Sequence, residues 1–164
     1  MTMRARVAVI TLAVASAAWL TPPLSARQAA DGPPRVVQWT LEVIRTAADG
    51  GLVMAEVRAT PRRGWRVYGQ AQPVAGPTPL AITILTPGVR QDGSVAADPE
   101  PDEKFDVVWS GRVRLHTKTT VFRVPLRVPS DARGPGALRL RVRWQACSDD
   151  ICLRPIETVV AADL

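Results

Sequence analysis

A period-two alternation of apolar and polar residues runs through this sequence and restricts the chain to β structure. Alternation with this period places successive side chains on opposite faces of a strand, so each run predicts a half-buried strand. The runs are Val37–Val43, Val53–Ala59, Leu80–Ile84, Val113–Leu115, Thr120–Val128, Leu138–Trp144 and Ile156–Val160. Each run ends at a turn signal, and no stretch of helical length has a 3.6-residue period. We therefore expect an all-β antiparallel sandwich of about seven to nine short strands.

Two places depart from the alternation. Residues Pro87 to Pro101 have no period and are expected to be irregular. Pro125 lies inside a run, and because proline has no N–H for the ladder, it requires an edge or bulge position. Hydrophobic residues make up 46% of the chain and charged residues 22%, enough to bury one core. We expect a single domain over residues 36–164.

Residues 1–26 have the three parts of a secretory signal peptide. Arg4 and Arg6 precede the apolar run Val7–Leu20, and a segment of small residues follows it. The apolar run is about 14 residues long and falls short of the roughly 20 that cross a bilayer. We therefore expect cleavage after residue 26 and a soluble periplasmic protein. Residues 27–35 contain Gly and Pro without a period and are expected to be a flexible lead-in.

Export changes how the positive charge is interpreted. The chain has 21 basic and 15 acidic residues, and the predicted leader removes two arginines and no acid. Many of the remaining arginines alternate with apolar residues along predicted strands, which is typical of a solvated sheet face. We therefore expect no nucleic-acid partner.

Cys147 and Cys152 are the only cysteines, and they lie in a polar turn between the last two predicted strands. In an exported protein they should pair with each other. A loop of about six residues contributes only about 2 kcal/mol in the chain-entropy model, so the bridge is a weak staple. A short bridge in a turn is also open to attack by an external thiolate, as in a working dithiol. Asp149 and Asp150 disfavour a thiolate, although acids are also ordinary turn residues.

The single histidine limits other kinds of chemistry. Two cysteines and His116 fall short of a four-ligand zinc set. His116 alternates with Arg112 and Arg114 on a face that the pattern predicts to be solvated, and nothing in the sequence places it beside a nucleophile. We therefore expect no metal, no cofactor and no hydrolase site.

The residues around the cysteine pair resemble those of a known family. Trp144-Gln145-Ala146-Cys147, Cys152 and Pro155-Ile156-Glu157-Thr158 are similar to a pattern in the amino-terminal periplasmic domain of the thiol:disulfide interchange protein DsbD, a disulfide bond corrector-like domain. Further matches lie upstream in the same order, at Gly64–Tyr68, Gly76–Pro79, Asp102–Asp106 and Phe122–Val128. The resemblance extends roughly from Val36 to Val160.

This resemblance implies an immunoglobulin-like sandwich whose redox-active disulfide relays reducing equivalents between thioredoxin-fold proteins. The domain would act as a thiol:disulfide oxidoreductase, a component of a protein-disulfide reductase. Its acceptors would be periplasmic disulfide isomerases and the thioredoxins of cytochrome c maturation. The best-known member carries a membrane electron transporter and a carboxy-terminal thioredoxin-like domain, whereas this chain ends at Leu164 with neither. We therefore expect electrons to come from a separate protein, such as a membrane electron transporter, and we expect a monomer.

The resemblance also implies roles for five residues. Cys152 would form the mixed disulfide with a partner, and Cys147 would resolve it. Phe105 resembles a cap residue that shields the disulfide until a partner displaces it. Tyr68 and Trp65 would line the same pocket, or would pack as ordinary aromatic residues in the core or on the surface.

Other functions remain open on the sequence alone. A non-catalytic immunoglobulin-like domain with a structural disulfide would bind a protein or an envelope component through its surface. A chaperone-like partner domain would keep the fold without the electron flow. The exchange function predicts a disulfide that a thioredoxin-like donor reduces while the fold stays intact, and the binding function predicts an inert or stability-linked bridge.

Overall fold

The computed structural model describes residues 35–45, 51–132 and 134–164, and in these residues the chain is all β, as expected. The predicted leader and lead-in lie outside them, apart from Arg35. Across the same residues no helix is present that could cross a membrane. The described strands are β1 (Val37–Arg45), β2 (Leu52–Pro61), β3 (Arg66–Tyr68), β4 (Ala81–Ile84), β5 (Arg90–Gln91), β6 (Ala96–Asp98), β7 (Asp102–Asp106), β8 (Gly111–His116), β9 (Thr120–Arg127), β10 (Leu138–Trp144), β11 (Ala146–Cys147) and β12 (Ile156–Ala162).

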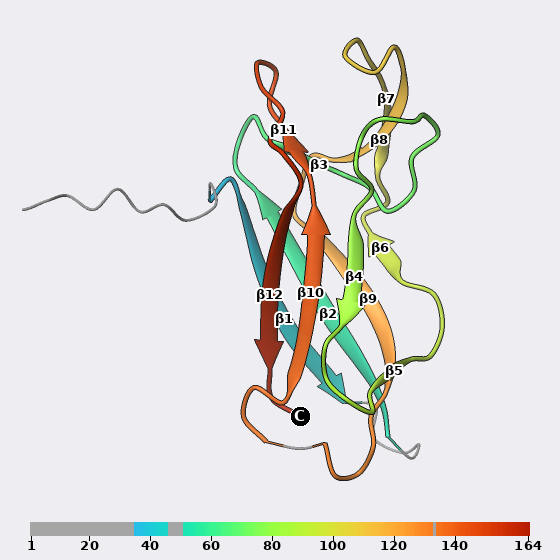
Figure 1. The fold of residues 1–164 in the computed structure, drawn as a ribbon, viewed down its shortest axis with the longest axis vertical. Coiled ribbons are helices and arrows are strands. Elements are labelled where there is room, and N and C mark those ends of the chain that lie inside the picture. The colour runs from blue at the N-terminus through green and yellow to red at the C-terminus, as the bar shows by residue number, and fades with distance from the viewer. Residues whose placement is uncertain (1–34, 46–50, 133) are drawn as a thin grey trace, which may run out of the picture. The chain divides into compact units, whose positions relative to one another are not determined.

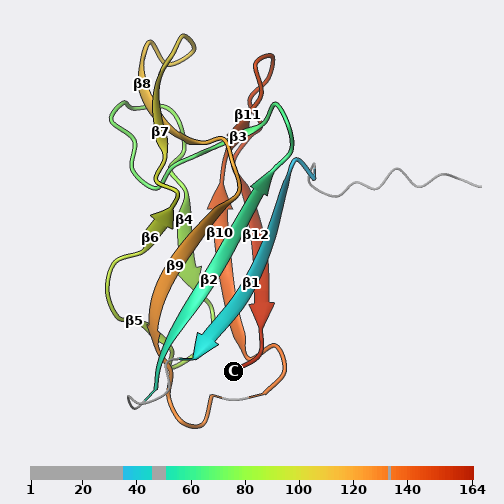
Figure 2. The same cartoon turned by 180° about the vertical axis from the view of Figure 1, so that it is seen from behind.

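Two antiparallel sheets lie face to face, which confirms the predicted sandwich. One sheet has the order β1-β2-β9-β5, with β6 also paired to β9, and the other has the order β12-β10-β4. Figure 1 shows the three-stranded sheet in front, and Figure 2 shows the other sheet from behind. Every pair of neighbouring strands is antiparallel.

The main core lies between these two sheets. Strand β10 alternates strictly between buried and exposed residues, and β2 buries every second residue from Val53 to Ala59, as the period-two pattern predicts. The ring of Trp39 lies 6.3 Å from that of Phe122 and 5.8 Å from that of Trp144, measured between centroids. Burial of these apolar side chains is the dominant force that holds the two sheets together.

A four-stranded sheet of order β11-β3-β8-β7 extends the sandwich at one end. Both ribbon views show it at the end opposite β5 (Figures 1 and 2). The chain leaves the three-stranded sheet after Trp144 and enters the four-stranded sheet at Ala146. A second, smaller core of Tyr68, Val113, Leu115 and Cys147 packs within this extension. The extension therefore carries the first cysteine.

Pro125 lies on β9 opposite an interruption in the neighbouring strand. Strands β5 and β6 pair with β9 on either side of Pro125 and leave it unpaired on that side. Its carbonyl accepts a hydrogen bond from the N–H of Asp92 (2.8 Å), and its nitrogen points the same way, toward the break. The sheet thus has a gap where the proline lacks a donor.

The expectation of an irregular segment from Pro87 to Pro101 is wrong in part, because β5 and β6 lie within it. These strands have only two and three residues, and most of their side chains are exposed. Strands this short carry no alternation that a sequence pattern could detect.

His116 is buried, so the expectation of a solvated face is wrong at this position. Arg112 and Arg114 are exposed, but His116 is only 3% exposed. Its ring packs edge-on against Phe122, with 5.0 Å between ring centroids. The alternation fails because the chain passes between sheets here: Leu115 belongs to the small core, whereas His116 packs against the main core.

Candidate functional site

A disulfide joins Cys147 and Cys152 at the free end of the four-stranded sheet. Strand β11 ends at Cys147, and a four-residue turn brings the chain back so that Cys152 forms a backbone bridge with it. The two Cα atoms are 4.0 Å apart. Two further backbone hydrogen bonds, of 2.8 and 2.9 Å, close the turn. The backbone therefore holds the cysteines opposite each other independently of the covalent bond.

The two sulfur-bearing residues differ in exposure. Cys147 is 2% exposed and packs with Tyr68, Val113 and Leu115 in the small core. Cys152 is partly exposed and packs against the outside of that cluster. An external thiolate therefore reaches Cys152 more easily than Cys147.

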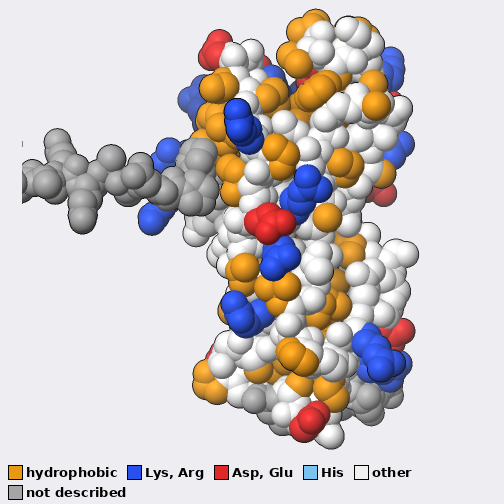
Figure 3. All heavy atoms as spheres, viewed as in Figure 1, with side chains coloured by type: hydrophobic (Ala, Val, Ile, Leu, Met, Phe, Trp, Pro, Cys, Tyr) orange, Lys and Arg blue, Asp and Glu red, His pale blue; other side chains and the backbone are white. Residues whose placement is uncertain are grey.

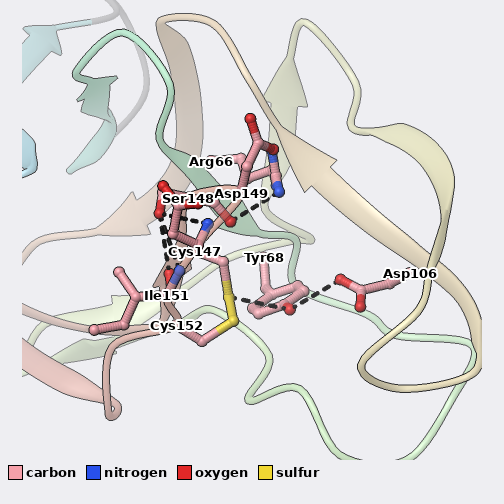
Figure 4. A network of polar contacts seen from close by, with 9 residues as sticks. Arg66, Tyr68, Asp106, Cys147, Ser148, Asp149, Ile151 and Cys152 are labelled. Atoms are coloured by element: carbon pink, nitrogen blue, oxygen red, sulfur yellow. Dashed lines mark hydrogen bonds and ion pairs between the residues drawn. A yellow bond between two sulfur atoms is a disulfide. The ribbon is translucent and has the colours of Figure 1, made fainter.

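Tyr68 lies beneath the disulfide and is fully buried. Its hydroxyl oxygen lies 3.3 Å from Cys147 Sγ and accepts a hydrogen bond from Trp109 Nε1 (2.8 Å). The same hydroxyl donates to Asp106 Oδ2 (3.4 Å), as Figure 4 shows. Burial raises the pKa of Tyr68, and the hydrogen bond from Trp109 acts in the opposite direction. The hydroxyl thus keeps its single proton, which Asp106 accepts in this structure and which rotation of the O–H bond can direct to the sulfur of Cys147 instead.

Arg66 holds the turn between the cysteines from the side. Its guanidinium makes an ion pair with Asp149 Oδ1 (2.7 Å) and donates to the carbonyl of Ser148 (2.8 Å). Arg66 lies on β3, where its backbone pairs with Cys147. The side chain of Arg66 is 27% exposed and that of Asp149 is 84% exposed. One side chain therefore contacts two successive residues of the turn that follows Cys147.

Both cysteines open into a hollow of about 480 Å³ between the cysteine turn and the β7–β8 hairpin. Four large apolar side chains on its lining are exposed: Phe105 (67%), Val107 (81%), Val108 (66%) and Ile151 (57%). In Figure 3, hydrophobic side chains gather at the end of the molecule that carries β7 and β8. Exposed apolar side chains that cluster around one hollow are typical of a surface that contacts another protein.

The structure brings most of the predicted site residues together. Phe105 lies on the lining of the hollow with both cysteines, and Tyr68 contacts Cys147 from below. Trp65 instead packs against the main core and does not line this hollow. The burial of Cys147 comes from the small core, of which Phe105 is not a member.

Sequence reasoning did not identify Trp109 or Asp106 as partners of Tyr68, nor Arg66 as a partner of the turn. The sequence feature that could have pointed to this region is Val107-Val108, two apolar residues in a hairpin turn whose side chains are exposed and belong to neither core. Asp106 organises that turn, because its Oδ1 accepts the N–H of Val108 (2.9 Å).

Two other matched segments support the site from below. Gly76 has a positive φ of 125°, and a Cβ at this position would overlap the ring of Trp109. Gln145 accepts a hydrogen bond from the N–H of Thr78 (2.7 Å) and donates to the carbonyl of Leu153 (3.0 Å). These residues thus fix the segments that flank the disulfide and Tyr68.

Comparisons with known proteins identify the family and the fold. Residues 38–164 match the family model described as thiol:disulfide interchange protein DsbD, N-terminal. The crystal structure of the N-terminal periplasmic domain of ScsB from Proteus mirabilis is similar, with a TM-score of 0.55 and 17% sequence identity. That match covers 89% of this chain and 50% of the other, so this chain spans about half the length of the ScsB structure.

A second solved structure, the yeast GGA1 GAE domain, has a TM-score of 0.43 and 8% identity, over 79% of this chain and 94% of that one. No curated protein matches this sequence. The ScsB likeness shows a shared immunoglobulin-like fold, in agreement with the expected fold class. Since the family model covers nearly all of the described residues, this chain belongs to the DsbD N-terminal family of thiol:disulfide interchange domains.

Proposed function

We propose that this protein relays reducing equivalents between thioredoxin-fold proteins in the periplasm through the Cys147–Cys152 pair. The observation that carries this proposal is the position of the disulfide, which opens into a hollow lined by exposed apolar side chains. A structural bridge needs no such surface, whereas a disulfide that reacts with a protein thiol needs a partner to dock beside it. Family membership supports thiol:disulfide exchange as the chemistry.

The exposure of the two cysteines supports a direction of attack. A donor thiolate attacks Sγ of the more exposed Cys152, the Cys147–Cys152 bond breaks, and Cys147 leaves as a thiolate. The second thiol of the donor, as its thiolate, then attacks the donor sulfur in the mixed disulfide and releases Cys152. Two electrons pass to this protein, the donor becomes a disulfide, and both cysteines take up protons. The Tyr68 hydroxyl, 3.3 Å from Cys147 Sγ, turns its one proton from Asp106 to the leaving thiolate and stabilises that thiolate by a hydrogen bond.

Oxidation by an acceptor disulfide follows the same steps in reverse. Cys152 attacks the acceptor and forms the mixed disulfide, and Cys147 attacks Cys152 Sγ to restore the bridge. The electron donor and the acceptors are both thioredoxin-fold proteins. The domain acts as a monomer that docks one partner at a time.

Phe105 acts as a movable cap in this proposal. It lies on the β7–β8 hairpin across the hollow from the cysteine turn and is two-thirds exposed, so a docking partner can displace it without disrupting a core. Phe105→Ala is expected to speed reduction of the disulfide by a small thiol several-fold, because the cap no longer shields it, and to leave stability within about 0.5 kcal/mol. Val159→Ala, at an exposed apolar residue on β12, is the control and should leave exchange unchanged. Equal rates for Phe105→Ala and the control would contradict the assigned role.

The first test is the reduction potential of the pair, measured by equilibration with a dithiol buffer. A potential above about −300 mV supports a working pair, because structural disulfides usually lie below that value. A lower potential, or a disulfide that a thioredoxin-fold donor leaves oxidised, would indicate a binding domain with a structural bridge instead.

Trapping tests the roles of the two cysteines. Cys147→Ser is expected to accumulate a mixed disulfide between Cys152 and an oxidised thioredoxin-fold acceptor, since this protein then has no thiol of its own to resolve it. Cys152→Ser should trap little complex, because Cys147 is buried. A reversed pattern, resolved on non-reducing gels, would exchange the two roles.

A further inference from the structure

Arg66 contacts the cysteine turn in a way that the shape of the turn does not require. Ser148 N–H bonds the Ile151 carbonyl (2.8 Å), and Leu153 N–H bonds the Ala146 carbonyl (2.9 Å), so the turn closes on its own backbone. Ser148 Oγ also accepts the N–H of Ile151 (3.1 Å). What Arg66 adds to this closed turn is a positive charge.

The other charges around the cysteines indicate why the positive charge of Arg66 matters. The charged residues that line the hollow are two cations, Arg66 and Lys104, and three carboxylates, Asp106, Asp149 and Asp150. An excess of carboxylates disfavours the thiolate, which is the reactive form of cysteine. Besides these charges, the neutral hydroxyl of Tyr68 contacts Cys147.

The position of Asp149 shows how Arg66 acts on this balance. In Figure 4 the Asp149 carboxylate meets the Arg66 guanidinium, and the sulfur atoms lie on the side of the turn that faces Tyr68. The ion pair is 2.7 Å long, and Arg66 also binds Ser148, so the carboxylate is fixed by a cation that is itself held at two points. Since the Arg66 side chain is mostly buried, water screens its charge less than that of a free surface arginine.

We propose that Arg66 is a positioning residue for the dithiol, which fixes and neutralises Asp149 so that a larger fraction of the reduced cysteines is thiolate at neutral pH. This inference rests on the proposed exchange function and adds to it the residue that tunes the reactivity of the pair. Without Arg66, the free carboxylate of Asp149 would oppose ionisation of the cysteines beside it.

The test uses 4,4′-dithiodipyridine, a small neutral disulfide that neither Arg66 nor the aspartates attract by charge. One cysteine thiolate of the reduced protein attacks the reagent and releases one 4-thiopyridone. The second cysteine then attacks the resulting mixed disulfide, which releases the second 4-thiopyridone and restores the Cys147–Cys152 bond. Two electrons and two protons pass from the dithiol to the reagent. The rate is measured by absorbance across a range of pH.

Opposite shifts are expected from the two partners of the ion pair. Arg66→Gln should raise the pH midpoint of reactivity by about one unit and slow the reaction near neutral pH about threefold, since the thiolate fraction falls more than its nucleophilicity rises. Asp149→Asn should lower the midpoint, because it removes a negative charge and keeps Arg66. Arg66→Lys should recover most of the Arg66→Gln shift, because it restores the charge.

Arg127→Gln is the matched control. It breaks an ion pair of similar length, to Asp92 (2.8 Å), at the β5 end of the sandwich and should leave the profile unchanged. A wild-type profile for Arg66→Gln, or shifts in the same direction for Arg66→Gln and Asp149→Asn, would overturn the inference. If Arg66→Gln fails to fold, Asp149→Asn decides, since its side chain is 84% exposed: an unchanged or raised midpoint refutes the role of charge. Because the reagent is not a protein, failure of transfer from a thioredoxin-fold donor would not affect this result.

Discussion

Reduction of the Cys147–Cys152 bond should lower stability only slightly and leave the protein folded. The disulfide closes a sequence separation of five residues. For a loop of about six residues, the chain-entropy model gives a contribution of about 2 kcal/mol to the free energy of unfolding. Single domains commonly have a stability of about 5–15 kcal/mol, so a loss of this size leaves the native state dominant.

The structure also indicates which part of the protein should respond to reduction. The main core between the sheets contains neither cysteine, whereas the small core contains Cys147. The turn keeps its backbone hydrogen bonds when the sulfur atoms separate. Changes on reduction should therefore be confined to the four-stranded sheet and its turn.

Urea denaturation with and without a reductant measures this contribution. The midpoint should fall in the reduced protein, while the dependence of the free energy on urea should stay the same, because the same surface is exposed on unfolding. The double variant Cys147→Ala/Cys152→Ala is the control, and reductant should not change its curve. A loss of more than about 4 kcal/mol in the free energy of unfolding, or unfolding on reduction alone, would refute the loop-closure reasoning and favour a structural disulfide on which the fold depends.

Three further tests, the first with a control substitution, probe packing, burial and hydrogen bonding in the folded protein. Gly76→Ala should destabilise the protein by about 2–3 kcal/mol in thermal denaturation, because the new methyl group overlaps Trp109. Gly64 also has a positive φ but has open space around it, so Gly64→Ala should destabilise the protein less. Burial lowers the pKa of His116 below its usual 6.5, so the folded state binds fewer protons than the unfolded state, and the free energy of unfolding should fall as the pH drops below about 6.5. His116→Asn should reduce the slope of the free energy of unfolding against pH, measured by urea titrations at several pH values. An unchanged slope would contradict this reasoning. Gln145→Leu leaves two backbone partners without a hydrogen bond and should cost about 2–3 kcal/mol, whereas a neutral effect would show that neither bond matters.

The long strands were predictable because each buries one face for its whole length. Strands β2, β9 and β10 follow the alternation residue by residue. The pattern fails where a strand is too short to have a period, as in β5, β6 and β11, or where the chain changes sheets, as at His116. At such a junction, successive side chains face different cores, and no single period describes them.

The site was predictable to the extent that its chemistry is local in the sequence. The two cysteines and their turn lie within six residues, and the family pattern around them points to Tyr68 and Phe105. The bond from Trp109 to Tyr68 spans 41 positions and that from Arg66 to Asp149 spans 83. Such contacts depend on which strands pair and at which register, and two of the strands concerned are too short to be recognised in the sequence: β3, which carries Arg66 and Tyr68, and β11, which precedes Asp149.

The two cores separate the part of the fold that gives stability from the bond that the proposed exchange would break. The main core is formed by strands that bury alternating apolar residues, and it does not depend on the oxidation state of the cysteines. The small core is built around Tyr68 and Cys147, next to the hollow whose lining includes exposed apolar residues. A thiol and a disulfide differ in volume, hydrogen bonding and charge, and this difference falls on a cluster of few residues at one end of the molecule. The proposed exchange with a partner would therefore repack that end while the sandwich, which fixes the positions of β3 and β8, stays unchanged.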